Sequence, residues 1–240
     1  MTQETVAFWS GHANSSAMCL RMKEIGNSPD LIVHATTGLE FPEVYTFMDK
    51  FEKLIDLPIV RENVLLTKPQ YNFDIFFNKP FCRGKFVGSI HGFPMMAGRC
   101  WHRDNVKRPV YKKYESIARE TYTGMTKDEV HRTDTNPKHR WPLIEYGWSA
   151  IDSLNYLRLR GIPHKIYDLG FKRLGCIFCP NQSKKQLFVV YKNYPEIWDR
   201  LLEYESRSPK PMRGSNTGNK NLFELQYEFE REIAKENKGR

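Results

Sequence analysis

The chain has 240 residues, of which 40% are hydrophobic and 13% aromatic, enough to bury one sizeable core or a core with a smaller appended lobe. A formal net charge of +9 favours a polyanionic partner such as a nucleotide, tRNA or DNA. No basic leader precedes an apolar stretch at the N-terminus, and no apolar segment reaches membrane-spanning length, so we expect no membrane partner and a cytoplasmic location. We expect an α/β domain over residues 1–180 and a helical C-terminal extension over residues 181–240.

The first predicted strand, residues 6–9, leads through a turn of small polar residues into a helix over residues 15–24. The first amides of a helix have no intrahelical acceptor and lie at the positive end of its dipole, so such a turn can bind phosphate. A plain turn with a helix N-cap is the other interpretation. The predicted nucleotide-binding residues of this loop are Ser10, Gly11, His12, Asn14, Ser15 and Ser16.

Two further strands are predicted at residues 31–35 and 58–60, with a helix between them that starts at Pro42 and runs to about Leu54. Alternating strands and helices with short connections predict a parallel sheet with right-handed crossovers. Ligands of such sheets bind beyond the carboxyl ends of the strands. The loop over residues 36–43 follows the second strand, and we expect it at the same edge as the first loop.

The rest of the chain gives weaker signals. Residues 71–101 are aromatic and glycine-rich and predict an ordered loop with short elements. A flexible linker is predicted over residues 206–219. We predict a strand over residues 141–144 and helices over residues 110–122, 150–160, 186–205 and 221–235.

Five cysteines in a reducing compartment indicate core thiols or metal ligands rather than disulfides. Cys19 lies on the apolar face of the first helix and is predicted to be a core residue. Cys176 and Cys179 form a Cys-x-x-Cys pair on a turn that Pro180 ends, which is a geometry used for iron–sulfur or zinc ligation. Because one pair supplies two ligands only, Cys100 and Cys82 are the predicted additional ligands. Zinc with four cysteines is the alternative to an iron–sulfur cluster.

The ordered set of these signals resembles the phosphoadenosine phosphosulfate reductase-like branch of the PP-loop ATP pyrophosphatase superfamily. The resemblance covers approximately residues 6–198. Its motifs are residues 10–16, Thr37-Gly38-Leu39-Glu40-Phe41-Pro42-Glu43, Arg99-Cys100 with Lys107, Gly124 with residues 128–132, residues 141–144 and residues 171–180.

The resemblance implies a Rossmann-like parallel sheet flanked by helices, of the adenine nucleotide α-hydrolase type, that binds ATP or a related adenine nucleotide. It adds Thr37, Gly38, Glu40 and Arg99 to the expected nucleotide site. Lys107 and Arg132 are expected catalytic cations, with Arg132 stabilising the departing pyrophosphate, and Glu129 is expected to orient Arg132 or hold Mg²⁺. An exposed i, i+3 helix pair is the alternative for Glu129 and Arg132.

The loop also departs from the family pattern Ser-Gly-Gly-Lys-Asp-Ser, because His12, Ala13 and Asn14 replace Gly, Lys and Asp. A lysine charge and a carboxylate are therefore both absent from it, and His12 is a weaker substitute for that charge at neutral pH. Thr36 stands where the family often has Asp. The chain also lacks a cysteine-rich C-terminal tail, which argues against the reduction of activated sulfate.

The leading hypothesis is an enzyme that cleaves the nucleotide at its α-phosphate and supports sulfur transfer to an acceptor, with help from a cysteine-bound iron–sulfur cluster. Nucleic acid, either tRNA or DNA, is the favoured acceptor because of the basic charge, and a homodimer is a further candidate assembly. The alternative is a non-catalytic nucleotide-binding or regulatory protein with a degenerate PP-loop and a structural metal site.

Overall fold

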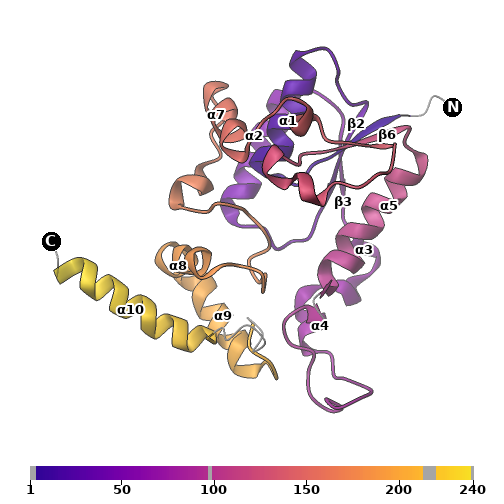
Figure 1. The fold of residues 1–240 in the computed structure, drawn as a ribbon. Coiled ribbons are helices and arrows are strands. Elements are labelled where there is room, and N and C mark those ends of the chain that lie inside the picture. The colour runs from indigo at the N-terminus through magenta and orange to yellow at the C-terminus, as the bar shows by residue number, and fades with distance from the viewer. Residues whose placement is uncertain (1–3, 97–98, 213–219, 239–240) are drawn as a thin grey trace. The chain divides into compact units, whose positions relative to one another are not determined.

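The computed structural model describes residues 4–96, 99–212 and 220–238 (Figure 1). The chain forms two compact units, each built from two segments. Unit 1 comprises Met1–Thr67 and Arg103–Asp168, and unit 2 comprises Lys68–His102 and Leu169–Arg240. The predicted domain boundary at residue 180 lies inside unit 2.

Unit 1 contains a five-stranded parallel sheet with the strand order β3-β2-β1-β6-β7. Ala7 of β1 is in register with Ile32 of β2 and with Tyr122 of β6. The sheet and its flanking helices confirm the predicted α/β, Rossmann-like fold class. The strands are β1 (Thr5–Phe8), β2 (Leu31–Ala35), β3 (Ile59–Glu62), β6 (Glu120–Thr123) and β7 (His139–Arg140).

The helices of unit 1 are mostly short. They are α1 (Ala13–Glu24), α2 (Pro42–Ile55), α3 (Val64–Thr67), α5 (Arg108–Ile117), α6 (Pro142–Glu145) and α7 (Ala150–Leu159), with a π-helical turn η2 (Arg103–Lys107) and the 3-10 helices η3 (Lys127–Arg132) and η4 (Lys165–Leu169). α2 and α6 begin at proline, which suits the first helical position because it has no amide hydrogen to leave unpaired.

Alternate residues of the central strands bury the two faces of the sheet, as the two-residue strand period requires. On one face, Val6 and Phe8 pack with Val110 and Tyr114 of α5. On the other, the fully buried Trp9 directly after β1 stacks on Phe51 of α2, with ring centroids 5.0 Å apart. α5 and the α1–α2 pair therefore cover opposite faces (Figure 1).

The strand order reverses direction at β1. From β1 the chain moves outward to β2 and β3, and it later returns to β1's other side as β6. In a parallel sheet, such a switch point leaves a crevice at the carboxyl ends of the two adjacent strands, where ligands bind. The loops after β1 and β6 border this crevice.

Two local predictions in unit 1 are wrong. The helix predicted over residues 110–122 ends at Ile117, and Glu120–Thr123 forms the strand β6 because its backbone pairs with β1. The segment predicted as a strand over residues 141–144 is instead the N-cap and start of the helix α6, and the strand β7 lies just before it. The other predicted strands and helices of unit 1 lie within a few residues of their expected bounds.

Unit 2 is mainly helical and has an aromatic core. Phe73 stacks on Phe178 at 4.5 Å, and Tyr204 packs edge-on against both rings. The predicted helix over residues 186–205 is two helices, because Pro195 cannot continue the first. The elements are η1 (Pro69–Tyr71), α4 (Phe73–Asn78), β4 (Met95–Met96), β5 (Arg99–Cys100), α8 (Lys184–Asn193), α9 (Pro195–Arg207) and α10 (Leu222–Lys238).

The buried carboxylate of Glu205 accepts a backbone amide from each side of the segment between α9 and α10. Glu205 accepts the amide of Met212 at 2.8 Å and the amide of Leu222 at 3.3 Å. The predicted linker over residues 206–219 lies partly outside the described residues. Of the described helices, none combines the length and apolar character needed to cross a membrane.

Candidate nucleotide-binding site

The loop between β1 and α1 is shaped by a glycine that no other residue can replace without strain. Gly11 has φ +76°, and a Cβ there would lie 2.7 Å from Sδ of Met48. His12 follows as the N-cap of α1, in extended conformation and without a side-chain capping bond. The first amides of α1, including those of Asn14 and Ser15, have no intrahelical acceptor and are the groups that can donate to an anion.

Three serine hydroxyls surround this helix start, but their roles differ. The Oγ atoms of Ser10 and Ser15 lie 3.0 Å apart, and Ser15 Oγ also accepts the Ser10 amide at 3.1 Å. Ser16 is fully buried, donates to the His12 carbonyl at 2.8 Å and accepts the indole N–H of Trp9 at 2.8 Å. Ser15 is also buried and its Oγ donates to the His12 carbonyl at 3.2 Å, so both Ser15 and Ser16 brace the loop, and Ser15 also forms the hydroxyl pair with Ser10 beside the helix amides.

The loop after β6 lies directly against this helix start. A Cβ at Gly124 would fall 2.7 Å from both Cα and N of Ser15, so only glycine fits. Thr126, two residues on, is 1% exposed, and its hydroxyl has no hydrogen-bond partner among the described residues. Because buried polar groups are nearly always satisfied, this hydroxyl is a candidate contact for a ligand or water.

A buried carboxylate lies beside the same loop. The Glu40 side chain is 1% exposed, and its oxygens lie 3.4 Å from His12 Nε2 and 3.5 Å from Lys107 Nζ. Thr37 donates its hydroxyl to Glu40 at 3.2 Å. Burial raises the pKa of Glu40, but the Lys107 charge and the His12 hydrogen bond outweigh it and hold that pKa well below its usual range.

This cluster joins three parts of the chain that the sequence prediction named separately. His12 comes from the first loop, Glu40 from the loop after β2, and Lys107 from the end of η2. The first loop has no lysine of its own, and Lys107 brings an ammonium group within reach of its N-cap residue through Glu40.

Two buried histidines were not predicted as site residues. His34 Nδ1 donates to the Trp9 carbonyl at 3.0 Å, and His164 Nε2 donates to the Gly11 carbonyl at 3.1 Å while its ring stacks on Phe47. Burial lowers the pKa of His34 to about 4 and that of His164 to about 3. Both rings are therefore neutral donors at pH 7 that hold the backbone on either side of Ser10. No local motif marks them, because each acts through a distant carbonyl.

The other predicted residues are placed as follows. Gly38 has φ +71° in the loop after β2, and Arg99 is exposed in β5 of unit 2. Glu129 and Arg132 lie on η3 and form an ion pair with each other, as the i, i+3 alternative requires. Among the ion pairs of the described residues, this pair shares no member with the Glu40 cluster.

The cysteines differ in burial: Cys19 is buried, Cys82 is exposed, and the other three are half-buried. Cys19 is fully buried in α1, and burial raises the pKa of its thiol to about 12, as expected of a core residue. Cys176 and Cys179 share one turn, in which the Cys179 amide donates to the Cys176 carbonyl at 3.1 Å. The Gln182 side chain donates to that carbonyl and to the Ile177 carbonyl, which fixes the turn.

The predicted set of three or four cysteine ligands is not assembled in the residues that the structure describes. Cys82 is exposed at 3.7 Å from the Pro80 carbonyl, and Cys100 lies in β5 opposite Met95. Within the described ranges, no three His, Cys, Asp or Glu side chains are grouped as a metal site needs. The turn offers two sulfur ligands, and ligation by all four cysteines stays a prediction of the sequence.

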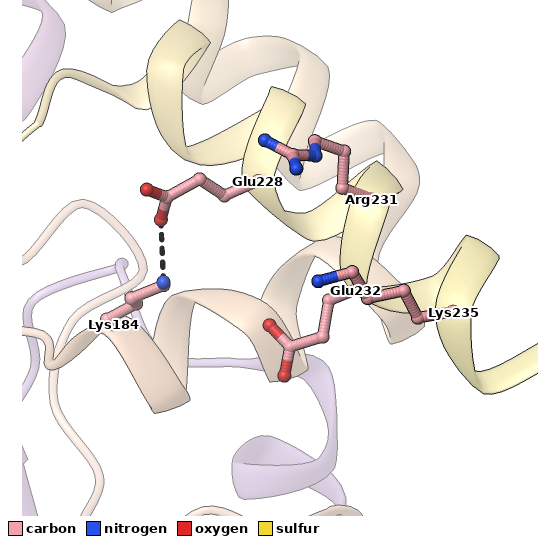
Figure 2. A pocket seen from close by; sticks show the side chains of 5 residues that line it. All are labelled: Lys184, Glu228, Arg231, Glu232 and Lys235. Atoms are coloured by element: carbon pink, nitrogen blue, oxygen red, sulfur yellow. Dashed lines mark ion pairs between the residues drawn. The ribbon is translucent and has the colours of Figure 1, made fainter.

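A pocket of ≈ 350 Å³ between α8 and α10 is a poor candidate for the nucleotide. Figure 2 shows Lys184 pointing toward Glu228, to which it is ion-paired at 2.6 Å. Arg231 and Lys235 share this wall with Glu232. Because the two carboxylates offset two of the three cations of the lining, the pocket offers only a weak positive field to a polyphosphate.

No protein-family model matches the chain. Two uncharacterized proteins of Methanocaldococcus jannaschii are similar to it, one 25% identical over 213 residues and the other 26% identical over 205 residues. These matches cover 84% and 83% of this chain but 42% and 47% of the relatives. The chain thus spans less than half the length of these curated relatives.

Among solved structures, the chain is similar to a phosphoadenylyl-sulfate reductase from Candida auris in its phosphate complex. The identity is 13%, the match covers 72% of this chain and 81% of the other, and the TM-score is 0.48. The chain is also similar to the U34-tRNA thiolase NcsA from Methanococcus maripaludis, solved with its 4Fe–4S cluster, at 15% identity over 86% of this chain and 73% of the other, with a TM-score of 0.45.

Proposed function

We propose that the protein binds ATP or a related adenine nucleotide through its phosphates at the start of α1, cleaves it at the α-phosphate, and supports sulfur transfer to a nucleic-acid acceptor. The observation that carries the proposal is the meeting of the first loop with Gly124 at the switch point of the sheet. Helix amides and the Ser10–Ser15 hydroxyl pair border that point, and the buried Thr126 hydroxyl follows Gly124 by two residues.

The chemistry assigned to these residues is electrostatic. The amides of Asn14 and Ser15 bind phosphate oxygens, and Lys107, held by Glu40, adds a positive charge that the loop itself lacks. An acceptor oxygen attacks the α-phosphorus, and the bond to pyrophosphate breaks. The acceptor is then an adenylate, from which a sulfur nucleophile displaces AMP. Arg132, oriented by Glu129, is assigned to the departing pyrophosphate, and Glu129 is the candidate Mg²⁺ ligand.

Ser15→Ala tests the phosphate site. We expect ATP affinity to fall about tenfold or more, because the variant removes a hydroxyl that donates to a charged phosphate. The measurements are titration calorimetry with ATP and a pyrophosphate-release assay on anaerobically purified protein with tRNA or DNA. Ser116→Ala is the matched control, since Ser116 is exposed on α5 and bonds only its own helix turn. Equal ATP affinity in the two variants would contradict the site.

The double variant Ala13→Lys/Asn14→Asp restores the Lys and Asp of the family loop. It tests whether the protein is an enzyme or a non-catalytic, regulatory nucleotide-binding protein. Ala13 is 1% exposed, so a lysine there must displace buried neighbours. We expect pyrophosphate release to fall in the double variant. The buried lysine would disturb the loop, and its charge would bring no gain because Lys107 already supplies a cation. A large gain in release would instead identify the native loop as degenerate and favour the non-catalytic protein.

A further inference from the structure

A short basic hairpin in unit 2, residues 79–91, is built as an ordered surface element outside the proposed nucleotide site. The Phe81 amide donates to the Ser89 carbonyl at 2.8 Å, and the His91 amide donates to the Lys79 carbonyl at 2.9 Å. Gly84 and Gly88 take φ values of +82° and +86° at the turns. In Figure 1 the hairpin follows α4 as an extended loop.

The charge of the basic hairpin is entirely positive. It contains Lys79, Arg83 and Lys85 and neither Asp nor Glu. All three cations are exposed, and none of them joins the ion pairs that the described residues form. Exposed cations on a surface loop attract a polyanion and gain from the release of its counterions.

Aromatic rings lie between these cations. Phe81 and Phe86 are half-buried, with ring centroids 5.8 Å apart, and each belongs to the same hairpin. The exposed Lys210 places its ammonium 4.3 Å from the centre of the Phe86 ring. His91 packs against Phe81 at 4.2 Å and stacks on the buried Phe76 of α4, which fixes the hairpin to the core of unit 2.

We propose that the basic hairpin, with Lys210, binds a single-stranded segment of nucleic acid. Its cations contact the phosphates, and the exposed sides of Phe81 and Phe86 stack on bases. Interleaved aromatic rings and cations are the arrangement that binds single strands without regard to sequence. The inference deepens the proposed function, because it gives the nucleic-acid acceptor a surface on this chain.

The test is fluorescence anisotropy of the full chain with a labelled pyrimidine single strand and with the matching duplex, over a range of salt concentrations. In the Arg83→Glu/Lys85→Glu variant we expect single-strand affinity to fall about tenfold or more, and the salt slope to fall by about 0.7 for each phosphate that is no longer neutralised. Lys50→Glu/Lys53→Glu on α2 is the control with the same change in net charge, and it should leave affinity within about threefold.

Phe86→Ala tests the stacking separately, and we expect it to weaken single-strand binding more than duplex binding. Equal decreases in affinity in the hairpin and control variants would overturn the proposal, since net charge alone would then account for binding. Equal affinity of wild type for heparin and for the single strand would also overturn it. ATP affinity, measured by titration calorimetry without nucleic acid, should be unchanged in the hairpin variant, so a failure here is distinguishable from a failure of the nucleotide site.

Discussion

Between pH 7 and pH 5, the free energy of unfolding is expected to fall by up to about 1.4 kcal/mol per pH unit for each of the two buried histidines, His34 and His164. Their pKa values are lowered by burial to about 4 and about 3, whereas both side chains titrate near 6.5 when the chain unfolds. Below pH 6.5 the unfolded chain therefore binds protons that the folded chain excludes, and stability decreases as the pH falls.

His34→Asn and His164→Gln isolate these contributions. Asn can replace the Nδ1–H donor to Trp9, and Gln can replace the Nε2–H donor to Gly11, but neither titrates. Urea unfolding at several pH values should show a slope reduced by about one proton in each variant. His131→Gln, at an exposed position on η3, is the control. An unchanged slope in both buried variants would refute the neutral, backbone-holding role of these rings.

Glu40 makes the free energy of unfolding depend on pH in a second, more acidic range. Its pKa is lowered by Lys107 and His12 against the effect of burial, so its stabilising contribution is complete above the ordinary carboxyl range. It is lost only as the pH falls below about 4.5 toward the lowered pKa of the folded state. Measurements between pH 7 and pH 5 therefore report the histidines rather than Glu40.

Gly124→Ala is the second change with a large expected effect. The new Cβ would lie 2.7 Å from Cα and N of Ser15, and backbone atoms of a helix start cannot move aside as a flexible side chain can. We expect unfolding free energy to decrease by about 3 kcal/mol and ATP binding to be abolished, measured by urea unfolding and calorimetry. The displacement would fall on the residue whose amide and hydroxyl are assigned to phosphate.

Gly175→Ala is the matched control, because it adds the same methyl group where the nearest atoms, of Cys179, are 3.9 Å away. Neither glycine requires a positive φ, so the comparison isolates steric contact from backbone strain. Similar stabilities in the two variants would show that the loop after β6 can move away from α1, contrary to the close packing of Gly124 on Ser15.

The sequence by itself determined the first half of the sheet and its loop. Thr5–Phe8, Leu31–Ala35 and the helices after them have strong local patterns, and the small polar turn at Ser10 precedes a helix start wherever the chain folds. The family resemblance also named Thr37 and Glu40, which form a hydrogen bond with each other in the structure. Such elements can be predicted from the sequence because hydrophobic periodicity and turn residues depend only on neighbouring positions in the chain.

Only the tertiary structure decided which distant groups support that loop. Glu120–Thr123 forms the interior strand β6 because its backbone pairs with β1, and the sequence of a four-residue segment does not reveal that pairing. His164 reaches the Gly11 carbonyl from 153 residues along the chain, and Lys107 and His12 meet at Glu40 from separate elements. Such contacts depend on how the elements pack. The residues beside the donor therefore do not indicate which distant carbonyl it will meet.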